Sequence, residues 1–445
     1  MRKWLKTAML ISSSFLLLLG CQSGSGGEHV STGNDQTDAI EEVKKKPEPI
    51  TLKLFNNANT TQYNFETKFK AHVDKKYPHI TLEFVLNQKG TTMSELAAIN
   101  QLPDLVYGKI SDRNQYMMDL TPLMEKHRFD KSKIKPVLWE TYSFLTDTDK
   151  KTLFVPFMTN MHLLHYNKSL FEKFGVPYPK NGMTWDETYE LAKKLTRTEG
   201  SVKYMGFNLR DNLHFTQGPQ MLLPYYDETT GKATLNSDNW QRYLANFIRF
   251  FQIPGNEATK SGGELGKDSL FLKEQRVAMY AAHPLFSTLA DMQAEGTTLD
   301  WDIVSLPYFP EAPRQGTSPN TNGLGITVTT KYPEEAWKVI ELLVSHEVQL
   351  LNARQGYESV LADDAQHQKE FGSEYEVLKG KNISAIFYNH YAPTPKPNDF
   401  NSSIKGIVTD YFRKAAWGET DLNTALREAN EAANKKIEEV RQTLK

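Results

Sequence analysis

Strands and helices alternate along the chain from residue 50 onward. Residues 50–55 alternate apolar and polar side chains, as a strand does. Phe65, Phe69 and Val73 recur every fourth residue, as on one face of a helix, and residues 80–86 form a second strand pattern. Because a strand, a helix and a strand in this order build a parallel sheet covered by helices, we expect an α/β fold.

The same alternation continues through the second half of the chain. Thr184 and Glu187 form a capping box that predicts the start of a helix, and residues 301–307 predict a strand that ends at a proline. We interpret residues 320–325 as a turn before a strand at 326–328. The roughly 395 residues that follow the N-terminal segment are enough for two lobes.

The N-terminal segment has the composition of a secretory signal. Basic residues at positions 2, 3 and 6 precede a mainly apolar stretch at 8–19, which is too short to cross a bilayer as a helix. The stretch ends in Leu18-Leu19-Gly20-Cys21, and Cys21 is the only cysteine. A single cysteine excludes an internal disulfide and a cysteine-based metal site.

Residues 18–21 resemble the lipobox of bacterial lipoproteins. The resemblance implies that residues 1–20 are a signal peptide and that Cys21 is lipidated and becomes the N-terminus. Residues 21–49 are rich in Gly, Ser and charged side chains, so we expect a flexible tether. The expected location is the extracellular face of the cell membrane, in a Gram-positive bacterium.

Charge and motifs argue against several functions. The formal net charge of −2 does not indicate nucleic acid binding. His346-Glu347 lacks the second histidine of a zinc protease, and His162 and His165 lack a nearby third ligand, so we expect no metal. Of these two histidines we expect one to pack and one to face solvent. We predict no cofactor, no catalytic residue and no enzyme.

Two functions stay open on the residues considered so far. A surface-anchored polysaccharide hydrolase needs a pair of carboxylates, and among 54 Asp and Glu such a pair cannot be located by sequence. A structural or adhesive surface lipoprotein is the other alternative. We assign Trp185, Trp301 and Trp337 to packing, because they lie at helix starts or inside strands.

An ordered set of segments resembles the family-1 extracellular solute-binding proteins. The segments are Val155–Phe157, His165–Phe171, Gly175-Val176 and Thr184–Glu187. The resemblance implies a two-lobed periplasmic-binding-protein-like fold, with discontinuous lobes joined by hinge strands. It also implies a monomer that works with the permease subunits of an ABC importer. The implied lobes are 50–158 plus 307–345 and 159–306 plus 346–445.

The resemblance also implies a ligand between the lobes, most simply an oligosaccharide or another sugar, with a non-sugar solute as the alternative. Aromatic rings stack on sugar faces, while amide, carboxylate and basic side chains bind hydroxyls. At His283–Phe286 a ligand-stacking tryptophan of a maltodextrin-binding member is either absent or replaced by Phe286. The family's cleft positions fall on Asn56, Asn57, Tyr107, Asp112, Arg113, Asn160, Asp211, His214, Phe215, His283, Phe286, Tyr391 and Phe400.

Overall fold

The computed structural model describes residues 47–58, 60–108, 115–142, 151–210, 220–394 and 400–443. Residues 48–445 form one compact unit, to which the following description applies. Cys21 and the expected tether up to residue 46 lie outside the described residues. None of the helices in the described ranges is long and apolar enough to cross a membrane.

The first sheet contains the predicted strand–helix–strand unit. Its strand order is β2 (Ile80–Leu86), β1 (Ile50–Asn57), β3 (Leu105–Gly108), β12 (Asn322–Ile326) and β4 (Val155–Met158). β1 pairs in parallel with both β2 and β3, whereas β12 runs antiparallel to β3 and β4. The chain therefore returns to this sheet after a long excursion.

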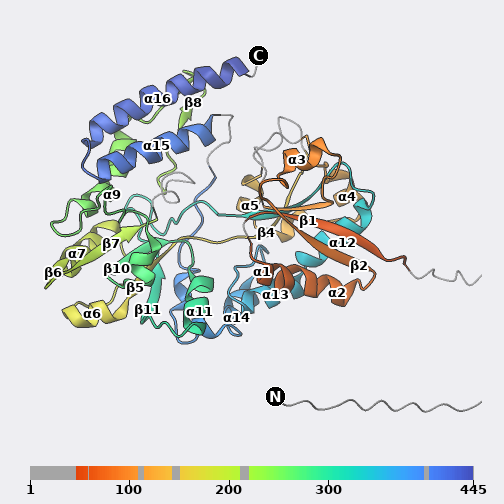
Figure 1. Cartoon of the computed structure of the whole chain (residues 1–445), viewed down its shortest axis with the longest axis horizontal. Helices are drawn as coiled ribbons and strands as arrows, with labels where there is room; N and C mark the ends of the chain where they lie inside the picture. Colours follow the sequence, from red (N-terminus) through yellow and green to blue (C-terminus); the bar gives the residue numbers. More distant parts are fainter. Residues whose placement is uncertain are drawn as a thin grey trace, which may run out of the picture. The chain divides into compact units, whose positions relative to one another are not determined.

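That excursion builds the second sheet. Its strand order is β11 (Trp301–Ser305), β5 (Leu163–Asn167), β10 (Val277–Ala282), β7 (Val202–Leu209) and β6 (Arg197–Glu199). β5 runs antiparallel to β11 and β10, while β7 is parallel to β10. The short β8 (Tyr226–Asp227) and β9 (Lys232–Ala233) pair separately. The two sheets with helices confirm the predicted α/β fold (Figure 1).

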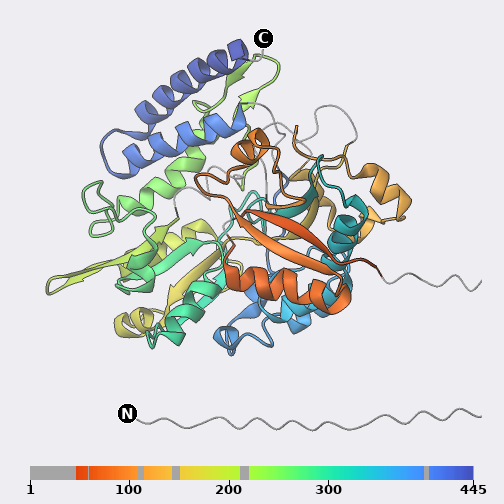
Figure 2. The same cartoon turned by 45° about the vertical axis from the view of Figure 1, so that its right-hand side comes forward.

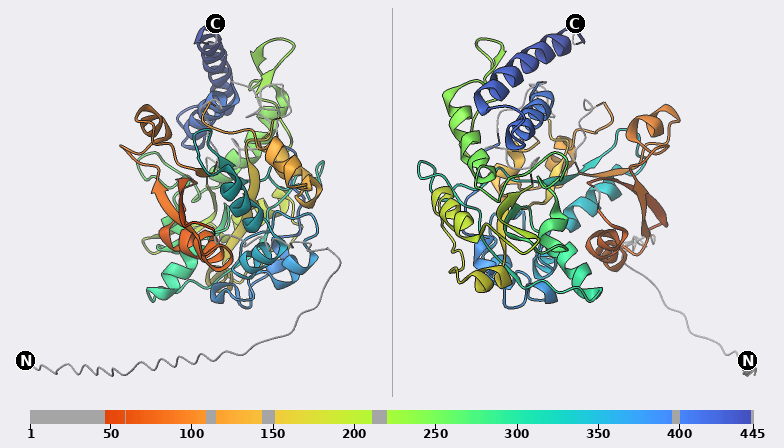
Figure 3. Two further views of the ribbon diagram at one scale, coloured as in Figure 1. Left: turned by 90° about the vertical axis from the view of Figure 1, so that its right-hand side faces the viewer. Right: turned by 60° about the vertical axis from the view of Figure 1, so that its left-hand side comes forward.

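Helices cover both sheets. The described helices are α1 (Gln62–Phe65), α2 (Ala71–Lys76), α3 (Met93–Ala98), α4 (Thr121–Lys126), α5 (Pro136–Glu140), α6 (Lys168–Phe174), α7 (Trp185–Leu195), α9 (Asp238–Phe251), α10 (Asp268–Leu272), α11 (Phe286–Ala294), α12 (Pro333–Leu343), α13 (His346–Arg354), α14 (Ala365–Glu370), α15 (Asn401–Ala416) and α16 (Leu422–Thr443). A π-helical turn, Glu66–Lys70, joins α1 to α2. α15 and α16 pack side by side and against α9 (Figures 2 and 3).

Two local predictions from the sequence are confirmed by the structure. The Thr184 hydroxyl accepts from the Glu187 amide, and the Glu187 carboxylate accepts from the Thr184 amide, which confirms the capping box. Trp185, Trp301 and Trp337 are buried, as predicted. Burial of their rings supplies a large share of the apolar area that holds each core together.

Two expectations need correction. The segment interpreted as a turn before a strand is the strand itself, because β12 covers residues 322–326 and residue 328 lies outside it. Val348, Val360 and Leu361 were assigned to lobe two, yet they pack in the core of the first sheet. Phe371 and Val377 pack with the second sheet instead. The remaining lobe boundaries stay a prediction.

Candidate functional site

Four strands of the first sheet begin or end at one edge of the sheet. The parallel strands β1 and β3 end together, with Asn57 opposite Gly108. The antiparallel β12 begins at the same edge, where Asn322 lies opposite Met158 at the end of β4. In α/β sheets the edge at the carboxyl ends of the parallel strands is where ligands bind.

The second sheet has a corresponding edge. β7 and β10 end there, since Leu209 lies opposite Ala281. β5 begins there, with Leu163 opposite both Ala282 and Ser305. Only residues 159–162 separate the end of β4 from the start of β5. The two edges are therefore joined directly by the chain.

Two chain segments join the two sheets, a third segment lies alongside them, and the three bond to one another. We call them the crossing segments: 159–162, 306–321 and 388–394. Asn160 and Asn320 exchange two backbone hydrogen bonds, with N···O distances of 3.3 and 3.2 Å. The amide of His390 donates to Arg314 at 2.8 Å, and Ala392 donates to Thr317 at 3.1 Å. Ladders of this kind allow bending while keeping the segments in register.

A group of tyrosines lies beside the first sheet's edge. The Tyr357 hydroxyl donates to the Asn64 side-chain oxygen at 2.9 Å, and burial raises its pKa to about 12. The Lys68 ammonium lies 4.6 Å from the centre of the Tyr357 ring. Tyr107 packs its ring against Phe69, while its hydroxyl donates to the Met158 sulfur at 3.3 Å. Tyr107, an expected site residue, is buried, so this group offers the partly exposed Tyr357 ring and neutral hydrogen-bonding atoms beside the buried Lys68 ammonium.

A charged group lies at the second sheet's edge. Arg210, directly after β7, pairs with Asp268 and lies 2.8 Å from ring nitrogens of His283, directly after β10. The Tyr280 hydroxyl donates to Asp268 at 2.5 Å. The guanidinium is therefore held in place by a carboxylate, which leaves the group close to electrically balanced.

The two histidines considered as a metal pair are both buried, which corrects the expectation that one faces solvent. His162 Nδ1 bonds to the Thr317 hydroxyl at 2.8 Å, and His165 Nε2 accepts from the Leu285 amide at 3.3 Å. Burial lowers the pKa of His165 to about 3, so its ring is neutral. Within the described ranges no three His, Cys, Asp or Glu side chains form a metal-binding group.

Several residues expected at the site lie at the two edges. Asn57, Asn160 and His283 do, and the buried side-chain oxygen of Asn160 has no hydrogen-bond partner. The Asn56 side-chain oxygen accepts from the Ala58 and Thr60 amides, so it shapes the loop after β1. The Tyr391 hydroxyl bonds within the crossing segments.

Two expected aromatic rings pack against other rings. Phe286 is buried, with its ring stacked on Trp301 at 6.2 Å between centres. Phe400 packs on Tyr226 at 4.8 Å. Five expected contacts fall outside the described residues: Asp112, Arg113, Asp211, His214 and Phe215.

Asn64, Lys68 and Tyr357 did not emerge from the sequence as candidates. Asn64 and Tyr357 are 293 positions apart, and no local pattern connects them. The one local signal is Gly356 before Tyr357, whose φ of +81° marks a tight turn after α13. This turn places the tyrosine beside the crossing segments, because Glu358 bridges Thr159.

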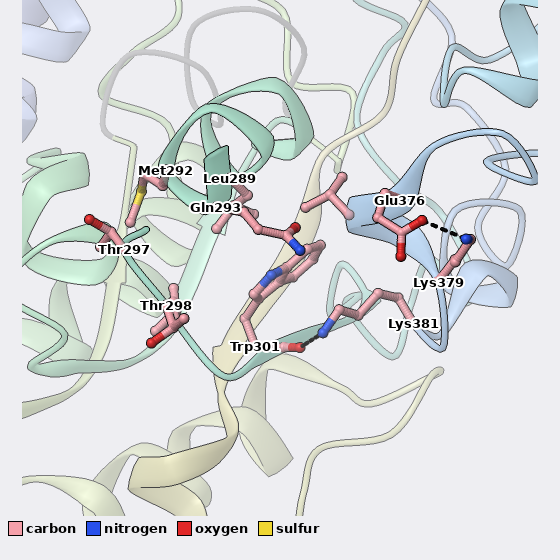
Figure 4. Close-up of a pocket in the computed structure, with 11 residues that line it drawn as sticks. Leu289, Met292, Gln293, Thr297, Thr298, Trp301, Glu376, Lys379 and Lys381 are labelled. Carbon is pink, nitrogen blue, oxygen red and sulfur yellow. Dashed lines mark hydrogen bonds and ion pairs between the residues drawn. The ribbon is translucent and has the colours of Figure 1, made fainter. Parts of the chain in front are cut away.

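A separate pocket of about 290 Å³ lies at the opposite end of the second sheet. Leu289, Met292 and Trp301 line it together with polar side chains at its rim (Figure 4). The Lys381 ammonium donates to the Trp301 carbonyl at 2.7 Å and lies 4.7 Å from the ring centre. β11 begins at this pocket and ends at the crossing, so the pocket is not part of the edge site.

Known proteins with similar sequences are solute binders. Residues 56–350 match the family model of the bacterial extracellular solute-binding proteins. The chain is 24% identical, over 330 residues, to the sn-glycerol-3-phosphate-binding periplasmic protein of Rhizobium meliloti, covering 69% of this chain and 73% of that protein. Its counterpart in Brucella melitensis is 23% identical over 76% of this chain and 80% of that protein.

Solved structures share the fold. An ABC substrate-binding protein from Listeria monocytogenes, in complex with cycloalternan, has a TM-score of 0.68 at 18% identity, covering 88% of this chain and 99% of that one. The glycerophosphocholine complex of UgpB from Mycobacterium tuberculosis has a TM-score of 0.68 at 16% identity, covering 89% and 100%. The fold is thus shared with these ABC substrate-binding proteins, and this chain belongs to the bacterial extracellular solute-binding protein family.

Proposed function

We propose that this protein captures a sugar or oligosaccharide between its two sheets and delivers it to the permease subunits of an ABC importer. The observation that carries the proposal is the pair of sheet edges, joined by residues 159–162 and 306–321, with hydrogen-bonding side chains on both. Asn57, Asn64 and Tyr357 come from one edge, and Arg210 and His283 come from the other. Pockets between lobes are a common place for small ligands.

The chemistry at the edges favours a neutral ligand. The first sheet offers amide and phenol groups, which bind hydroxyls as both donors and acceptors. Arg210 at the second edge is paired with Asp268, so its charge is largely balanced. The Tyr357 ring offers an apolar face on which a sugar ring stacks. The structures of relatives with cycloalternan and with α-D-tagatose support this class of ligand.

A glycerol phosphate is the second candidate. Two observations favour it: the Rhizobium and Brucella relatives bind sn-glycerol 3-phosphate, and Arg210 with His283 forms a basic pair at the edge. A phosphate placed there would compete with Asp268 for the guanidinium, whose fork geometry suits both anions. The two candidates differ in charge, so salt dependence of binding separates them.

We further propose that the protein is a monomeric lipoprotein and not an enzyme. Its relatives are binding proteins. Signal cleavage before Cys21, lipidation of Cys21 and a tether at residues 21–49 would hold the binding unit on the outer face of a Gram-positive membrane. The site residues inferred from the family stay part of this proposal, including those outside the described ranges.

A thermal-shift and calorimetry panel tests the ligand class. The binding unit, from residue 48 onward, is titrated with maltotriose, D-tagatose, D-mannitol and sn-glycerol 3-phosphate. A ligand at a hundredfold excess over its Kd stabilises the folded state by about 2.7 kcal/mol, so the unfolding midpoint should rise for a sugar. A rise with sn-glycerol 3-phosphate alone would favour the second candidate. No rise with any sugar or oligosaccharide would contradict the sugar proposal.

A further inference from the structure

Glu358 is a buried carboxylate at the centre of the crossing segments. Its Oε1 accepts a hydrogen bond of 2.5 Å from the Tyr391 hydroxyl. Lys135 Nζ lies 3.7 Å from the same oxygen, but it is closer to Asp364, at 2.7 Å. The buried Oε2 of Glu358 has no hydrogen-bond partner. Because a buried carboxylate is expensive to hold without full pairing, its presence here calls for an explanation.

A chain of hydroxyls connects Glu358 to all three crossing segments. The Thr159 hydroxyl lies 3.4 Å from the Tyr391 hydroxyl and 3.2 Å from that of Thr321. A tyrosine hydroxyl has one proton, and here it goes to Glu358. Thr159 must then donate to Tyr391, and Thr321 to Thr159. The donors therefore all point toward the carboxylate, an arrangement in which each bond polarises the next.

The residue before Glu358 reaches the candidate site. Glu358 forms an antiparallel bridge with Thr159, so the chain is extended there, and side chains of successive residues point to opposite sides. Tyr357 accordingly reaches Asn64 beside the first sheet's edge, while Glu358 reaches Tyr391. A ligand that displaces Tyr357 would move a segment that also carries Glu358.

We propose that Glu358 is a positioning residue which, through Tyr391 and Thr159, couples contact of a ligand with Tyr357 to the orientation of the crossing segments. The proposal rests on the proposed function, in which a ligand binds between the sheet edges. In the resting protein, the hydroxyl chain holds the three crossing segments in one arrangement. A ligand against Tyr357 shifts Glu358 and loosens that arrangement, which lets the sheets reorient.

The test uses spin labels on the two sheets. In a Cys21→Ser background, Lys76→Cys in α2 and Lys194→Cys in α7 place one label on each side of the crossing, both at exposed positions. Pulsed electron resonance gives the distribution of distances between the labels without any ligand. Tyr391→Phe and Thr159→Val each remove one hydroxyl of the chain at nearly constant volume. Tyr178→Phe is the matched control, since it removes a hydroxyl that donates to Glu172 at the surface.

The expected result is a shifted or broadened distance distribution for Tyr391→Phe and Thr159→Val, with unchanged cooperative melting. The Tyr178→Phe distribution should superimpose on that of the parent. Superposition of all three variants would overturn the proposal. Unfolding of both hydroxyl variants would also overturn it, because the network would then hold the fold and not the orientation.

A second arm adds maltotriose or sn-glycerol 3-phosphate to the labelled proteins. Ligand should shorten the distance in the parent and change it less in Tyr391→Phe. If neither probe changes the parent distribution, those two compounds do not reorient the sheets. The resting distributions would still decide the role of Glu358, so the two proposals fail separately.

Discussion

The ammonium of Lys68 lies 4.6 Å from the centre of the Tyr357 ring and is almost wholly buried, with 4% of the residue exposed. Burial lowers the pKa of Lys68 to about 8, partly opposed by Glu374. A cation over an aromatic face gains attraction, but here it does not make up for the water lost. We therefore expect the charged form of Lys68 to weaken the folded state.

Replacing Lys68 by Met should stabilise the protein at pH 7. Below about pH 8 the lysine is charged in both states, and only the folded state pays for its burial. Between about 8 and 10.5 the unfolded chain holds a proton that the folded chain does not, so wild-type stability rises with pH. The advantage of Lys68→Met, up to about 3 kcal/mol, should shrink across this window.

Urea unfolding of wild type and Lys68→Met at pH 7, 8.5 and 10 measures this difference. Lys75→Met, at an exposed site on α2, serves as the control and should show no such trend. A difference between Lys68→Met and wild type that stays constant with pH would mean that the pKa of Lys68 is not lowered.

The second prediction concerns the stability of variants of Gly108, at the end of β3. Gly108 has a φ of +126°, and a Cβ there would lie 2.8 Å from the backbone carbon of Asn57. Gly108→Ala must therefore distort the edge of the first sheet as well as adopt a strained φ, at about 1–3 kcal/mol for the φ alone. Gly175→Ala, with a φ of +65° and no atom within 4 Å of its Cβ, isolates the strain from the clash.

Denaturant titration should show a larger loss for Gly108→Ala than for Gly175→Ala. The Asn57 loop should also move in the first variant, so ligand affinity should fall there and not in the second. Equal losses of stability in both variants would indicate that the edge relaxes around the added methyl group.

The sequence predicted the sheets better than it predicted β12. Glycine is depleted in strands, so the two glycines at 323 and 325 suggested a turn. The structure gives the physical reason for them: a Cβ on Gly323 would lie 2.8 Å from the Tyr142 hydroxyl, and one on Gly325 would lie 2.5 Å from the Met117 methyl carbon. Only the packing of Tyr142 and Met117 in the folded protein shows why this strand has glycine at positions 323 and 325.

The candidate site was predicted in outline only. Asn57, Asn160 and His283 could be placed because they follow or precede recognisable strands. Phe286 has an aromatic ring of the kind that stacks on sugars, but in the structure this ring stacks on Trp301. Tyr357 could not be found by periodicity, because its partner Asn64 comes from the other end of the first sheet's sequence.

Tyr357 itself provides a test of the site. Tyr357→Ala removes a partly exposed ring, so sugar affinity should fall by about 1–3 kcal/mol, roughly five- to 150-fold. Tyr357→Phe keeps the ring and loses only the bond to Asn64, so its effect should be smaller. Calorimetric titration with whichever sugar shifts the unfolding midpoint measures both, and Tyr332→Ala at the start of α12 is the control. Affinities unchanged in Tyr357→Ala would move the site away from this edge.

The last prediction concerns Cys21, the single cysteine of the chain. If the lipobox is used, Cys21 carries two or more acyl chains, and such anchoring is stable because one chain alone gives only marginal membrane affinity. Cys21→Ser should then leave an uncleaved precursor or release the protein into the medium. Labelled palmitate should enter wild type and not the variant, since no other thiol is available in the chain.

Detergent-phase partitioning of whole cells provides the measurement, with Ser25→Ala in the same segment as the control. Wild type and Ser25→Ala should enter the detergent phase, and Cys21→Ser should leave it. Binding of sugar by purified Cys21→Ser should equal that of wild type, because the binding unit begins at residue 48. If Cys21→Ser still enters the detergent phase after signal cleavage, a lipid on this cysteine does not anchor the protein.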